Sequence, residues 1–318
     1  MNIVILNGGL GNNLFQFAYG LSSFVESDLI LDWSARKSLF SKSKNSLIEC
    51  NLPKDIKVFN RRNYSFLFKL CNMHLLHLLV TKNERRVLLR IFFDWFLTKF
   101  VHQYLSYRYK GKVEIYLEGN KVTKFNGRRK IKVHVGYFQT EKFSKRVDAN
   151  IFQELLKTFS KSALYLEYKS KALSMNPLVI HVRIGDYMQN PKLGQLPRDY
   201  FINALNQLVS KFEVKNLWIF SDSEEIVGSY VPESFSDITT IIPTRQLPPG
   251  LILKIMSLGK LFVISNSSFS WWAAYLRENK SAPVVAPIPW FAEQPWEKDL
   301  LPSEWSKVPV EYNVGPKG

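Results

Sequence analysis

The second half of the chain alternates short apolar runs with helical patterns, and this alternation limits the possible folds more than any other feature. Five runs rich in β-branched and apolar residues have the length of strands: 178–182, 217–220, 239–242, 261–264 and 284–286. Patterns with helical spacing lie between them, at 198–212, 249–258 and 268–277. Strands that alternate with helices in this way predict a parallel sheet wound on both faces.

Polar clusters follow three of these predicted strands. They are His181–Tyr187, Ser221–Ser223 and Ser265–Ser268. Ligands of open α/β sheets bind outside the carboxyl ends of the strands, so we expect the three clusters to converge on one site. For the first cluster alone, the alternative is a solvated loop with an ion pair.

The third cluster indicates an anion site. Its hydroxyls and backbone amides precede a helix that is predicted to begin at Phe269, and a helix N-terminus attracts negative charge. The alternative is an N-cap without a ligand. In the second cluster, Asp222 is expected to accept hydrogen bonds from a base or a ribose, and the alternative is a plain surface aspartate.

The N-terminal part begins with a second α/β pattern. We expect a strand at 2–6, a glycine-rich turn at 7–13, a helix at 14–24 and strands at 29–31 and 131–135. Leu14 stands where the dinucleotide fingerprint requires a third small residue, which excludes an NAD site. The amides of Asn12, Asn13 and Gln16 are expected either to hold sugar hydroxyls or only to cap the helix. A link near 174–177 predicts two domains, 1–175 and 176–318.

Positive charge is concentrated in residues 57–132. This window holds eighteen lysines and arginines against four acidic residues, so it carries +14 of the net charge of +16. Its apolar runs between Arg61 and Lys110 predict a basic helical insertion. Such helices either contact an anionic membrane or form a core pair with a solvated face. An RNA-binding protein without catalysis is an alternative from a different class, although no aromatic-decorated sheet motif supports it.

The location of the protein is predicted from what the sequence lacks. The N-terminus has no basic leader before its apolar run, and no apolar stretch of about twenty residues occurs. The two cysteines, Cys50 and Cys71, have no motif spacing. We therefore expect a cytoplasmic protein, either free or peripheral on the inner face of the cell membrane.

Five ordered motifs resemble those of the family 11 glycosyltransferases, the α-1,2-fucosyltransferases. Gly8–Ala18 is similar to the family's opening G-G-L-G-N-Q-M-F-Q-Y-A, and Gly136–Gln139 to its G-Y-[FW]-Q. His181–Tyr187 resembles H-x-R-R-G-D-Y, and Phe220–Ser223 resembles F-S-D-D. Ser265–Trp272 matches S-N-S-S-F-S-W-W at every position.

The resemblance implies an α/β fold of GT-B type, with two Rossmann-like domains facing a cleft. It also implies an inverting, metal-independent transfer of L-fucose from GDP-β-L-fucose to the 2-hydroxyl of a β-galactoside. The acceptor would be a precursor of O-antigen or surface polysaccharide, lipid-linked precursors included, and no cofactor is implied. Another GDP-sugar or linkage is the alternative. The implied donor-binding residues are Arg183, Asp222, Ser223, Asn266, Ser267, Ser268 and Phe269.

Four residues are the candidates for catalysis. Negative charge grows on the departing β-phosphate, and Arg183 together with the helix N-terminus can stabilise it. His181 has an ordinary pKa suited to a general base, but it is expected on the phosphate side. Asn12 is expected to orient the acceptor, and Asp186 to orient Arg183. The residues do not single out the general base.

Two positions depart from the family pattern. Ile184 stands where the family often has a second arginine, which leaves Arg183 as the one cation of this motif. Restoring an arginine at 184 is expected to change activity modestly. Asn13 replaces the usual glutamine, and we expect this to affect acceptor preference more than chemistry.

Overall fold

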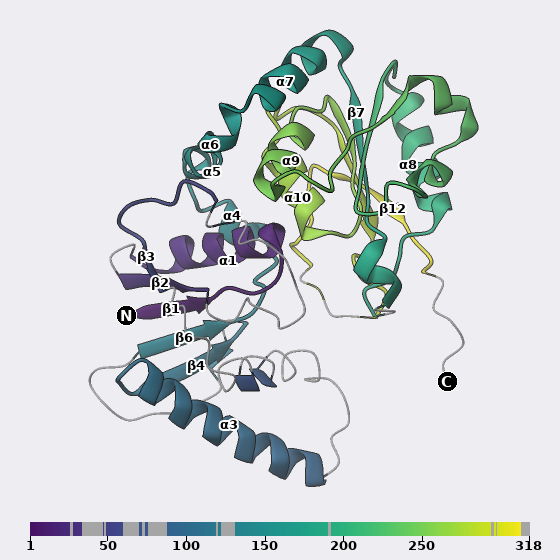
Figure 1. Cartoon of the computed structure of the whole chain (residues 1–318). Coiled ribbons are helices and arrows are strands. Elements are labelled where there is room, and N and C mark those ends of the chain that lie inside the picture. Colours follow the sequence, from purple (N-terminus) through teal and green to yellow (C-terminus); the bar gives the residue numbers. More distant parts are fainter. Residues whose placement is uncertain are drawn as a thin grey trace. The chain divides into compact units, whose positions relative to one another are not determined.

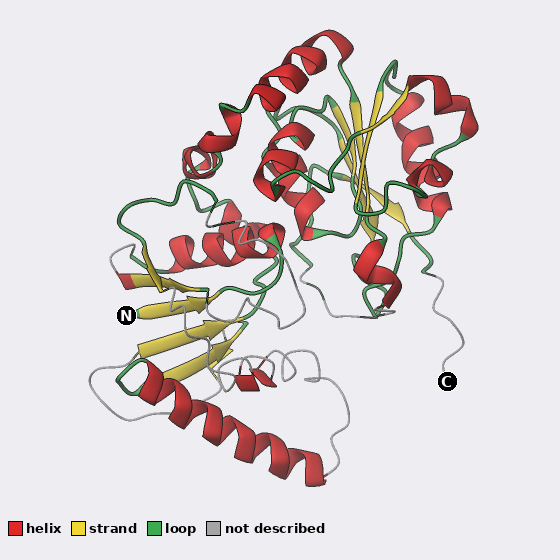
Figure 2. Ribbon diagram, viewed as in Figure 1, coloured by secondary structure: helices red, strands yellow, loops and turns green. Residues whose placement is uncertain are grey.

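A computed structural model describes residues 1–25, 28–33, 47, 49–59, 70–71, 74–75, 88–118, 120–121, 131–189, 192–293, 296 and 298–312. Its contacts divide the chain into two compact units. The N-terminal unit comprises Met1–Asn45 and Leu52–Val147, and the C-terminal unit comprises Ser46–Asn51 and Asp148–Gly318. Each unit contains a β-sheet with helices packed against it (Figures 1 and 2).

The sheet of the N-terminal unit has six strands within the described residues, in the order β3-β2-β1-β6-β4-β5. All neighbours are parallel except β4 and β5, which are antiparallel. The strands are β1 (Asn2–Ile5), β2 (Leu29–Asp32), β3 (Lys57–Phe59), β4 (Val113–Leu117), β5 (Asn120–Lys121) and β6 (Ile131–Val135).

Helices α1 (Leu10–Ser23) and α3 (Leu88–Arg108) lie on opposite sides of this sheet (Figure 1). Alternate residues of a strand point to one face, and those of β1, β4 and β6 that face α3 form a core with its Val101 and Leu105. On the other face His134 of β6 contacts Tyr19 of α1. The two-fold period of the strands therefore separates an apolar layer from a partly polar one.

Helix α1 begins earlier than its apolar spacing predicts. The predicted range was 14–24, but the backbone N–H of Asn13 already donates to Gly9 O at 3.0 Å. Of the predicted turn at 7–13, only the part before Leu10 lies outside the helix, and Gly8 adopts a left-handed backbone with φ 77°. The polar side chains of this segment are therefore fixed to a rigid helix.

Within the described residues, the basic window contains strands as well as a helix. Strands β3, β4 and β5 and the first residues of β6 lie within 57–132, and α3 covers the sheet that they form. Much of 60–87 and all of 122–130 lie outside the described residues, including most of the predicted helical run before α3. Across the described ranges, no helix is long and apolar enough to cross a membrane.

The sheet of the C-terminal unit is parallel throughout its described strands, in the order β12-β11-β10-β7-β8-β9. Its first strand lies in the middle and the order reverses beside it, as in doubly wound nucleotide-binding sheets. The strands are β7 (Leu178–Val182), β8 (Leu217–Ser221), β9 (Thr239–Ile241), β10 (Leu261–Val263), β11 (Val284–Ile288) and β12 (Ser306–Pro309). The predicted class, α/β with two Rossmann-like domains, is confirmed.

One strand of this sheet was not predicted. Strand β12 lies at the sheet edge, and of its four side chains only Val308 is buried. An edge strand with a single buried side chain has no apolar run to reveal it. The central strands β7 and β8 are buried at every residue, which is why their sequences read as continuous apolar runs.

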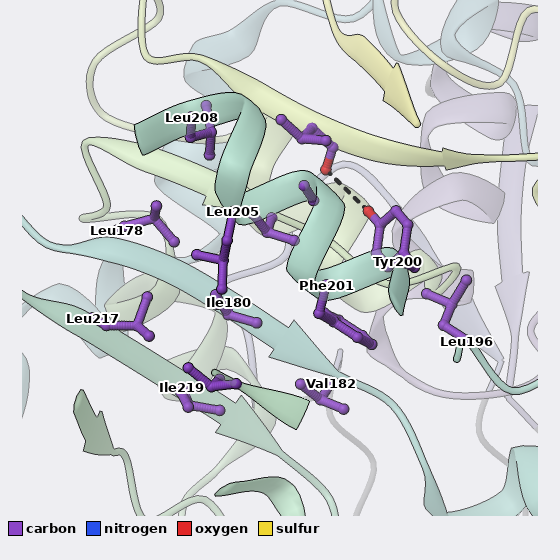
Figure 3. Packing of buried hydrophobic residues seen from close by; sticks show 14 of the residues in the cluster. Leu178, Ile180, Val182, Leu196, Tyr200, Phe201, Leu205, Leu208, Leu217 and Ile219 are labelled. Carbon is purple, nitrogen blue, oxygen red and sulfur yellow. Dashed lines mark hydrogen bonds between the residues drawn. The ribbon is translucent and has the colours of Figure 1, made fainter. Parts of the chain in front are cut away.

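The apolar face of α8 (Arg198–Val209) packs on the sheet (Figure 3). Tyr200, Phe201, Ala204, Leu205 and Leu208 are buried at helical spacing and belong to the same core cluster as the inward residues of β7 and β8. Helices α9 (Pro249–Met256) and α10 (Ser268–Tyr275) pack against each other on the other side of the sheet.

The division between the units differs from the predicted boundary at 175/176. Helices α5 (Ala149–Leu155), α6 (Lys157–Ser160) and α7 (Ala163–Met175) belong to the C-terminal unit, where α6 and α7 contact α9. The Tyr165 hydroxyl donates to Glu278 Oε1 at 2.6 Å. The turn at Asn176, whose φ of 47° is left-handed, ends α7 and leads into β7. It marks a helix end within one unit.

Candidate functional site

The polar motifs lie where the strand order of each sheet reverses. In the C-terminal unit this switch point lies between β7 and β10, which are parallel neighbours. Doubly wound sheets bind their ligands at such points. Arg183 follows β7, Ser265–Ser268 follow β10, and Asp222 follows the adjacent strand β8. The predicted convergence of the three clusters is therefore present within this unit.

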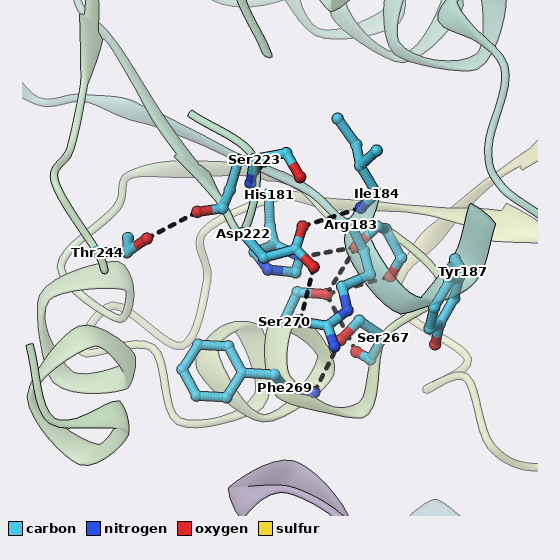
Figure 4. A network of polar contacts seen from close by, with 12 residues as sticks. His181, Arg183, Ile184, Tyr187, Asp222, Ser223, Thr244, Ser267, Phe269 and Ser270 are labelled. Carbon is cyan, nitrogen blue, oxygen red and sulfur yellow. Dashed lines mark hydrogen bonds and ion pairs between the residues drawn. The ribbon is translucent and has the colours of Figure 1, made fainter. Parts of the chain in front are cut away.

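Arg183 and Asp222 form the charged centre of this site (Figure 4). Arg183 Nη1 lies 3.2 Å from Asp222 Oδ2, and the two side chains are 30% and 25% exposed. Asp222 Oδ1 accepts from the backbone N–H of Ile184 at 3.0 Å. A side chain at Gly185 would collide with this carboxylate. Asp222 thus holds both the backbone and the guanidinium of the Arg183 segment, while its predicted contact with a base or ribose stays a prediction.

Ile184 points away from the site into the core. Its side chain is 1% exposed and belongs to the cluster that packs on α8. An arginine here would have to bury its guanidinium, which is costly without a partner. We therefore expect Arg at this position to lower stability, and the modest change in activity stays a prediction.

His181 is enclosed beneath the same site. It is 5% exposed, and its Nδ1 lies 2.7 Å from Ser265 Oγ. Burial, assisted by the nearby positive charge of Arg183, lowers the pKa of His181 to about 3. The ring is therefore neutral at neutral pH. A neutral, buried ring is not suited to supply a cation to a phosphate or to accept a proton from an exposed hydroxyl, and the catalytic role of His181 stays a prediction.

The N-terminus of α10 lies beside Arg183 (Figure 4). Ser267 is the N-cap, and its Oγ accepts from the backbone N–H of Phe269 at 3.3 Å. Ser268 and Phe269 are partly exposed in the first turn. Ser270 Oγ donates back to Ser265 O and Ser267 O, each at 3.1 Å. The serines of the motif therefore shape a helix N-terminus that attracts negative charge.

The two tryptophans of the motif anchor α10. Trp271 and Trp272 are completely buried, and Trp271 Nε1 donates to Leu300 O at 2.9 Å. Trp272 packs against Phe152 of α5, with ring centres 4.8 Å apart. The apolar half of the motif thus holds the helix in position, while the polar half faces the switch point.

Asn266 is enclosed by the protein. Its side chain is completely buried, and Nδ2 donates to Leu193 O, Gly194 O and Tyr312 Oη at 3.1, 2.9 and 3.3 Å. Asn266 O accepts from the Tyr187 hydroxyl at 2.8 Å. It braces the segment around residues 193–194, and its predicted donor contact stays a prediction.

Two further predicted residues lie near Arg183 in the chain. Ser223 is partly exposed beside Asp222, and its backbone N–H donates to Ser221 Oγ at 3.0 Å. Asp186 lies in the 3-10 helix η2 (Gly185–Gln189), but its side chain is outside the described residues. Asp222 holds Arg183, and the expectation that Asp186 orients Arg183 stays a prediction.

The switch point of the N-terminal unit lies between β1 and β6. There Asn12, partly exposed in the first turn of α1, accepts from Gln139 Nε2 at 2.8 Å. Asn13 and Gln16 are completely buried, and Gln16 Oε1 accepts from Asn13 Nδ2 and from Asn7 N. Of the three predicted amides, only Asn12 faces outward, so Asn13 and Gln16 hold the turn.

We also searched the structure for groups of side chains that could bind a metal ion. Among the described residues, no three His, Cys, Asp or Glu side chains are grouped so that they could hold a metal ion. The predicted independence from metal stays a prediction.

The sequence profile of Glycosyl transferase family 11 matches residues 1–308. The chain belongs to glycosyl transferase family 11. An "Alpha-1,2-colitosyltransferase" from Escherichia coli is 26% identical over 320 residues, covering 97% of this chain and 99% of that protein. The E. coli "O-antigen biosynthesis glycosyltransferase WbnK" is 24% identical over 315 residues, covering 90% and 94%. The crystal structure of fucosyltransferase NodZ from Bradyrhizobium has a TM-score of 0.45 at 12% identity, covering 86% of this chain and 92% of that chain.

Membership of family 11 confirms the resemblance carried by the five motifs. It makes the chain a glycosyltransferase by family, so the alternative of an RNA-binding protein without catalysis is not carried further. The family alone leaves the donor, the acceptor and the linkage open.

Sequence reasoning missed several residues of this family 11 site. Thr244 Oγ1 lies 2.7 Å from Ser221 O, and its backbone N–H donates to Glu224 Oε1 at 2.6 Å. These contacts tie the loop after β9 to the end of β8. Glu224 follows the F-S-D-S segment and could have been included from that position. Thr244 lies outside every motif, so no sequence signal pointed to it.

Proposed function

We propose that this family 11 glycosyltransferase moves L-fucose from GDP-β-L-fucose to the 2-hydroxyl of a β-galactoside in a surface-glycan precursor. The reaction would invert the anomeric centre. We further propose that no metal is needed, because the protein has its own positive groups for the departing diphosphate. The support is the family membership, the five motifs and the chemistry of the two switch points.

The single observation that carries this proposal is the Arg183 guanidinium, which lies beside Ser267 and Phe269 at the N-terminus of α10 (Figure 4). As the bond between sugar and diphosphate breaks, negative charge grows on the β-phosphate. A fixed cation and oriented N–H groups stabilise that charge more than they stabilise the ground state. The Asp222 carboxylate holds the guanidinium, so little reorganisation is required when the charge develops. Ser267 and Ser268 would add contacts at the helix N-terminus.

We assign acceptor binding to the N-terminal switch point. Asn12 and Gln139 are partly exposed amides, and their mutual hydrogen bond fixes how both face outward. Amides carry donors and acceptors without net charge, which suits sugar hydroxyls. Asn12 would orient the attacking 2-hydroxyl.

The test is incubation with GDP-fucose and a panel of β-galactosides in the presence of EDTA. We expect GDP release with at least one acceptor and a disaccharide product with an α-1,2 linkage. Absence of GDP release with every acceptor would refute the transferase. Activity that EDTA abolishes and added metal restores would refute the metal-free reaction.

Colitose is a second candidate for the transferred sugar, because one relative is named an alpha-1,2-colitosyltransferase. Colitose is fucose without its 3-hydroxyl, so the two donors present the same diphosphate. Comparing kcat/KM for GDP-fucose and GDP-colitose with one acceptor decides between them. A protein that hydrogen-bonds the 3-hydroxyl should reject the deoxy sugar strongly.

We also propose that α3 contacts an anionic membrane in which a lipid-linked acceptor is anchored. Phe96, Phe100 and Tyr107 are 57%, 41% and 84% exposed, and helical spacing puts them on one face with Lys99 and Gln103. Val101 and Leu105 on the opposite face are buried against the sheet. Exposed aromatic rings together with a lysine suit the headgroup region of an anionic bilayer.

Co-sedimentation with vesicles of phosphatidylglycerol and phosphatidylcholine tests this surface. Binding should exceed that to phosphatidylcholine alone and should fall at high salt. The triple change Phe96→Ser, Phe100→Ser and Tyr107→Ser should abolish it, whereas Leu166→Ser with Leu173→Ser on the exposed face of α7 should not. Equal losses in both variants, or binding unaffected by salt, would refute the proposal.

The proposed location is the cytoplasm, with peripheral contact at the inner membrane face. Cys50 and Cys71 are both buried, and burial raises the pKa of their thiols, to about 12 and about 11. The support for this location comes from the sequence, in which the two cysteines have no motif spacing and no apolar stretch of about twenty residues occurs. Fractionation of cells at low and high salt tests this location, and recovery outside the cytoplasmic face would refute it.

A further inference from the structure

The turn that follows β6 is held by one carboxylate from another part of the N-terminal unit. Glu118, at the end of β4, accepts from the backbone N–H of Tyr137 at 2.5 Å through Oε1. Its Oε2 accepts from the N–H of Phe138 at 3.0 Å. Glu118 is exposed, and each of its carboxylate oxygens accepts a hydrogen bond from one of two successive backbone amides in the Gly136–Gln139 motif.

Two residues of this arrangement have unusual backbones. Phe138 has φ 51° and Glu118 has φ 46°, both in the left-handed region that non-glycine residues rarely adopt. Such conformations persist only where surrounding contacts hold them, and they are frequent at functional sites. The Phe138 ring stacks on Tyr19 with centres 3.8 Å apart. Stacking therefore holds the side chain of Phe138, and Glu118 holds its backbone.

The absence of a side chain at Gly136 leaves room for the Glu118 carboxylate. A Cβ at this position would lie 2.5 Å from Glu118 Oε1 and 2.6 Å from its carboxyl carbon. The glycine therefore allows the close approach on which the two hydrogen bonds depend. Its carbonyl oxygen also accepts from Gln16 Nε2 at 2.7 Å, which joins the turn to α1.

The turn ends at the exposed amide pair. Gln139 directly follows the left-handed Phe138, and its Nε2 donates to Asn12 Oδ1 at 2.8 Å. A change in the backbone at Tyr137 or Phe138 would move Gln139 and, through it, the Asn12 amide.

We propose that Glu118 is a positioning residue for the acceptor: by holding the 136–139 turn it sets the orientation of Gln139 and Asn12. It acts through these two amides and does not itself touch the reacting atoms. The inference rests on the proposed acceptor role of Asn12. It adds a residue that lies outside all five motifs and on a different strand from the turn it holds.

The first test does not depend on activity. Glu118→Gln keeps the size of the side chain but presents an NH2 group to one of the two amides, so one hydrogen bond is lost. Amide hydrogen exchange at Tyr137 and Phe138 should quicken at least tenfold in this variant. Glu167→Gln, at an exposed glutamate paired with Lys171 on α7, is the control and should leave both amides unchanged. Unchanged exchange in Glu118→Gln would overturn the proposed hold on the turn.

The second test separates positioning from a general loss of structure. In Glu118→Gln the KM for the acceptor should rise about tenfold, the size expected for one hydrogen bond to a charged group. The kcat should stay within about twofold, and the Kd for GDP should not change. Gly136→Ala should have the same pattern, because it displaces the same carboxylate.

A double-variant cycle supplies the decisive comparison. If Glu118 acts through Asn12, then Glu118→Gln should add nothing to the effect of Asn12→Ala. Independent effects would multiply to about a hundredfold rise in acceptor KM and would overturn the positioning role. A wild-type protein without transferase activity would refute the proposed function instead, and the exchange experiment would still report on Glu118.

Discussion

The two units use the same point of similar sheets but equip it with different chemistry. The switch point of the C-terminal unit has an ion pair, Arg183 with Asp222, beside the N-terminus of α10. That of the N-terminal unit has two neutral amides, Asn12 and Gln139, and its carboxylate Glu118 is used on backbone N–H groups. The switch point thus offers fixed charge in one unit and neutral hydrogen bonding in the other.

This difference suggests a division of labour. A diphosphate leaving group gains negative charge and requires a fixed cation, whereas a sugar acceptor presents neutral hydroxyls and requires donors and acceptors in a set geometry. In both units, buried polar side chains accompany the exposed groups. They are Asn13 and Gln16 in the N-terminal unit and His181 in the C-terminal unit. The exposed chemistry of each unit is therefore held by a second set of buried polar contacts.

The largest expected effect comes from removing the charge at the C-terminal switch point. Arg183→Gln should lower kcat/KM by about 10²- to 10³-fold, because the guanidinium is the proposed fixed cation for the leaving diphosphate. Steady-state kinetics with saturating acceptor measures this loss. Arg198→Gln, at an exposed arginine on α8, is the matched control and should be neutral. Near-wild-type turnover in Arg183→Gln would break the comparison, since the two switch points would then be alike.

The next largest effect tests whether the site tolerates a second cation. Ile184→Arg should destabilise the protein by about 3–4 kcal/mol, because it replaces a buried core side chain with a charge that has no partner. Ile184→Val should cost only about 1 kcal/mol. Urea unfolding followed by tryptophan fluorescence measures both. Wild-type stability with raised activity in Ile184→Arg would mean that the side chain reaches the diphosphate.

A smaller effect is expected at the N-terminal switch point. Asn12→Ala should raise the acceptor KM about tenfold, because one neutral hydrogen bond and its amide partner are lost. GDP affinity, measured by calorimetry, should stay the same. Asn206→Ala at an exposed position on α8 is the control. If Asn12→Ala weakened GDP binding as strongly as acceptor binding, the assignment of separate roles to the two switch points would fail.

The smallest effect at neutral pH concerns two buried histidines, His134 in the N-terminal unit and His181 in the C-terminal unit. Burial lowers the pKa of His134 and of His181 to about 3, against an ordinary value of about 6.5 in the unfolded chain. Between these values only the unfolded state binds the proton. Each histidine therefore contributes stability that is complete above pH 6.5 and is lost as the pH falls toward 3, by about 1.4 kcal/mol per pH unit.

Urea midpoints at pH 7 and pH 5 measure this loss. His134→Gln and His181→Gln should each flatten the fall in stability relative to the wild type. A wild-type slope in either variant would mean that the replaced ring is not held neutral in the folded unit.

The motifs of the chain identified most of the C-terminal site in advance. The apolar runs of β7, β8 and β10 located the strand ends, and the polar residues after them proved to lie at one switch point. The sequence did not reveal which of the polar residues face inward. Asn266, Asn13 and Gln16 have the side chains of a binding site, but all three are buried and hold the backbone around them. The identity of an asparagine or glutamine does not indicate whether its side-chain amide faces a ligand or the protein's own carbonyl groups.

By itself the sequence determined the α/β class, the order of most strands and helices and the family, because periodicity and motif spacing are local properties of the chain. Only the tertiary structure decided which charges meet. It paired Arg183 with Asp222 from a neighbouring strand, buried Ile184 and His181, and brought Glu118 to the amides of Tyr137 and Phe138. These contacts join residues distant in the chain, and their energies depend on burial and on distances of about 3 Å, which no local pattern specifies.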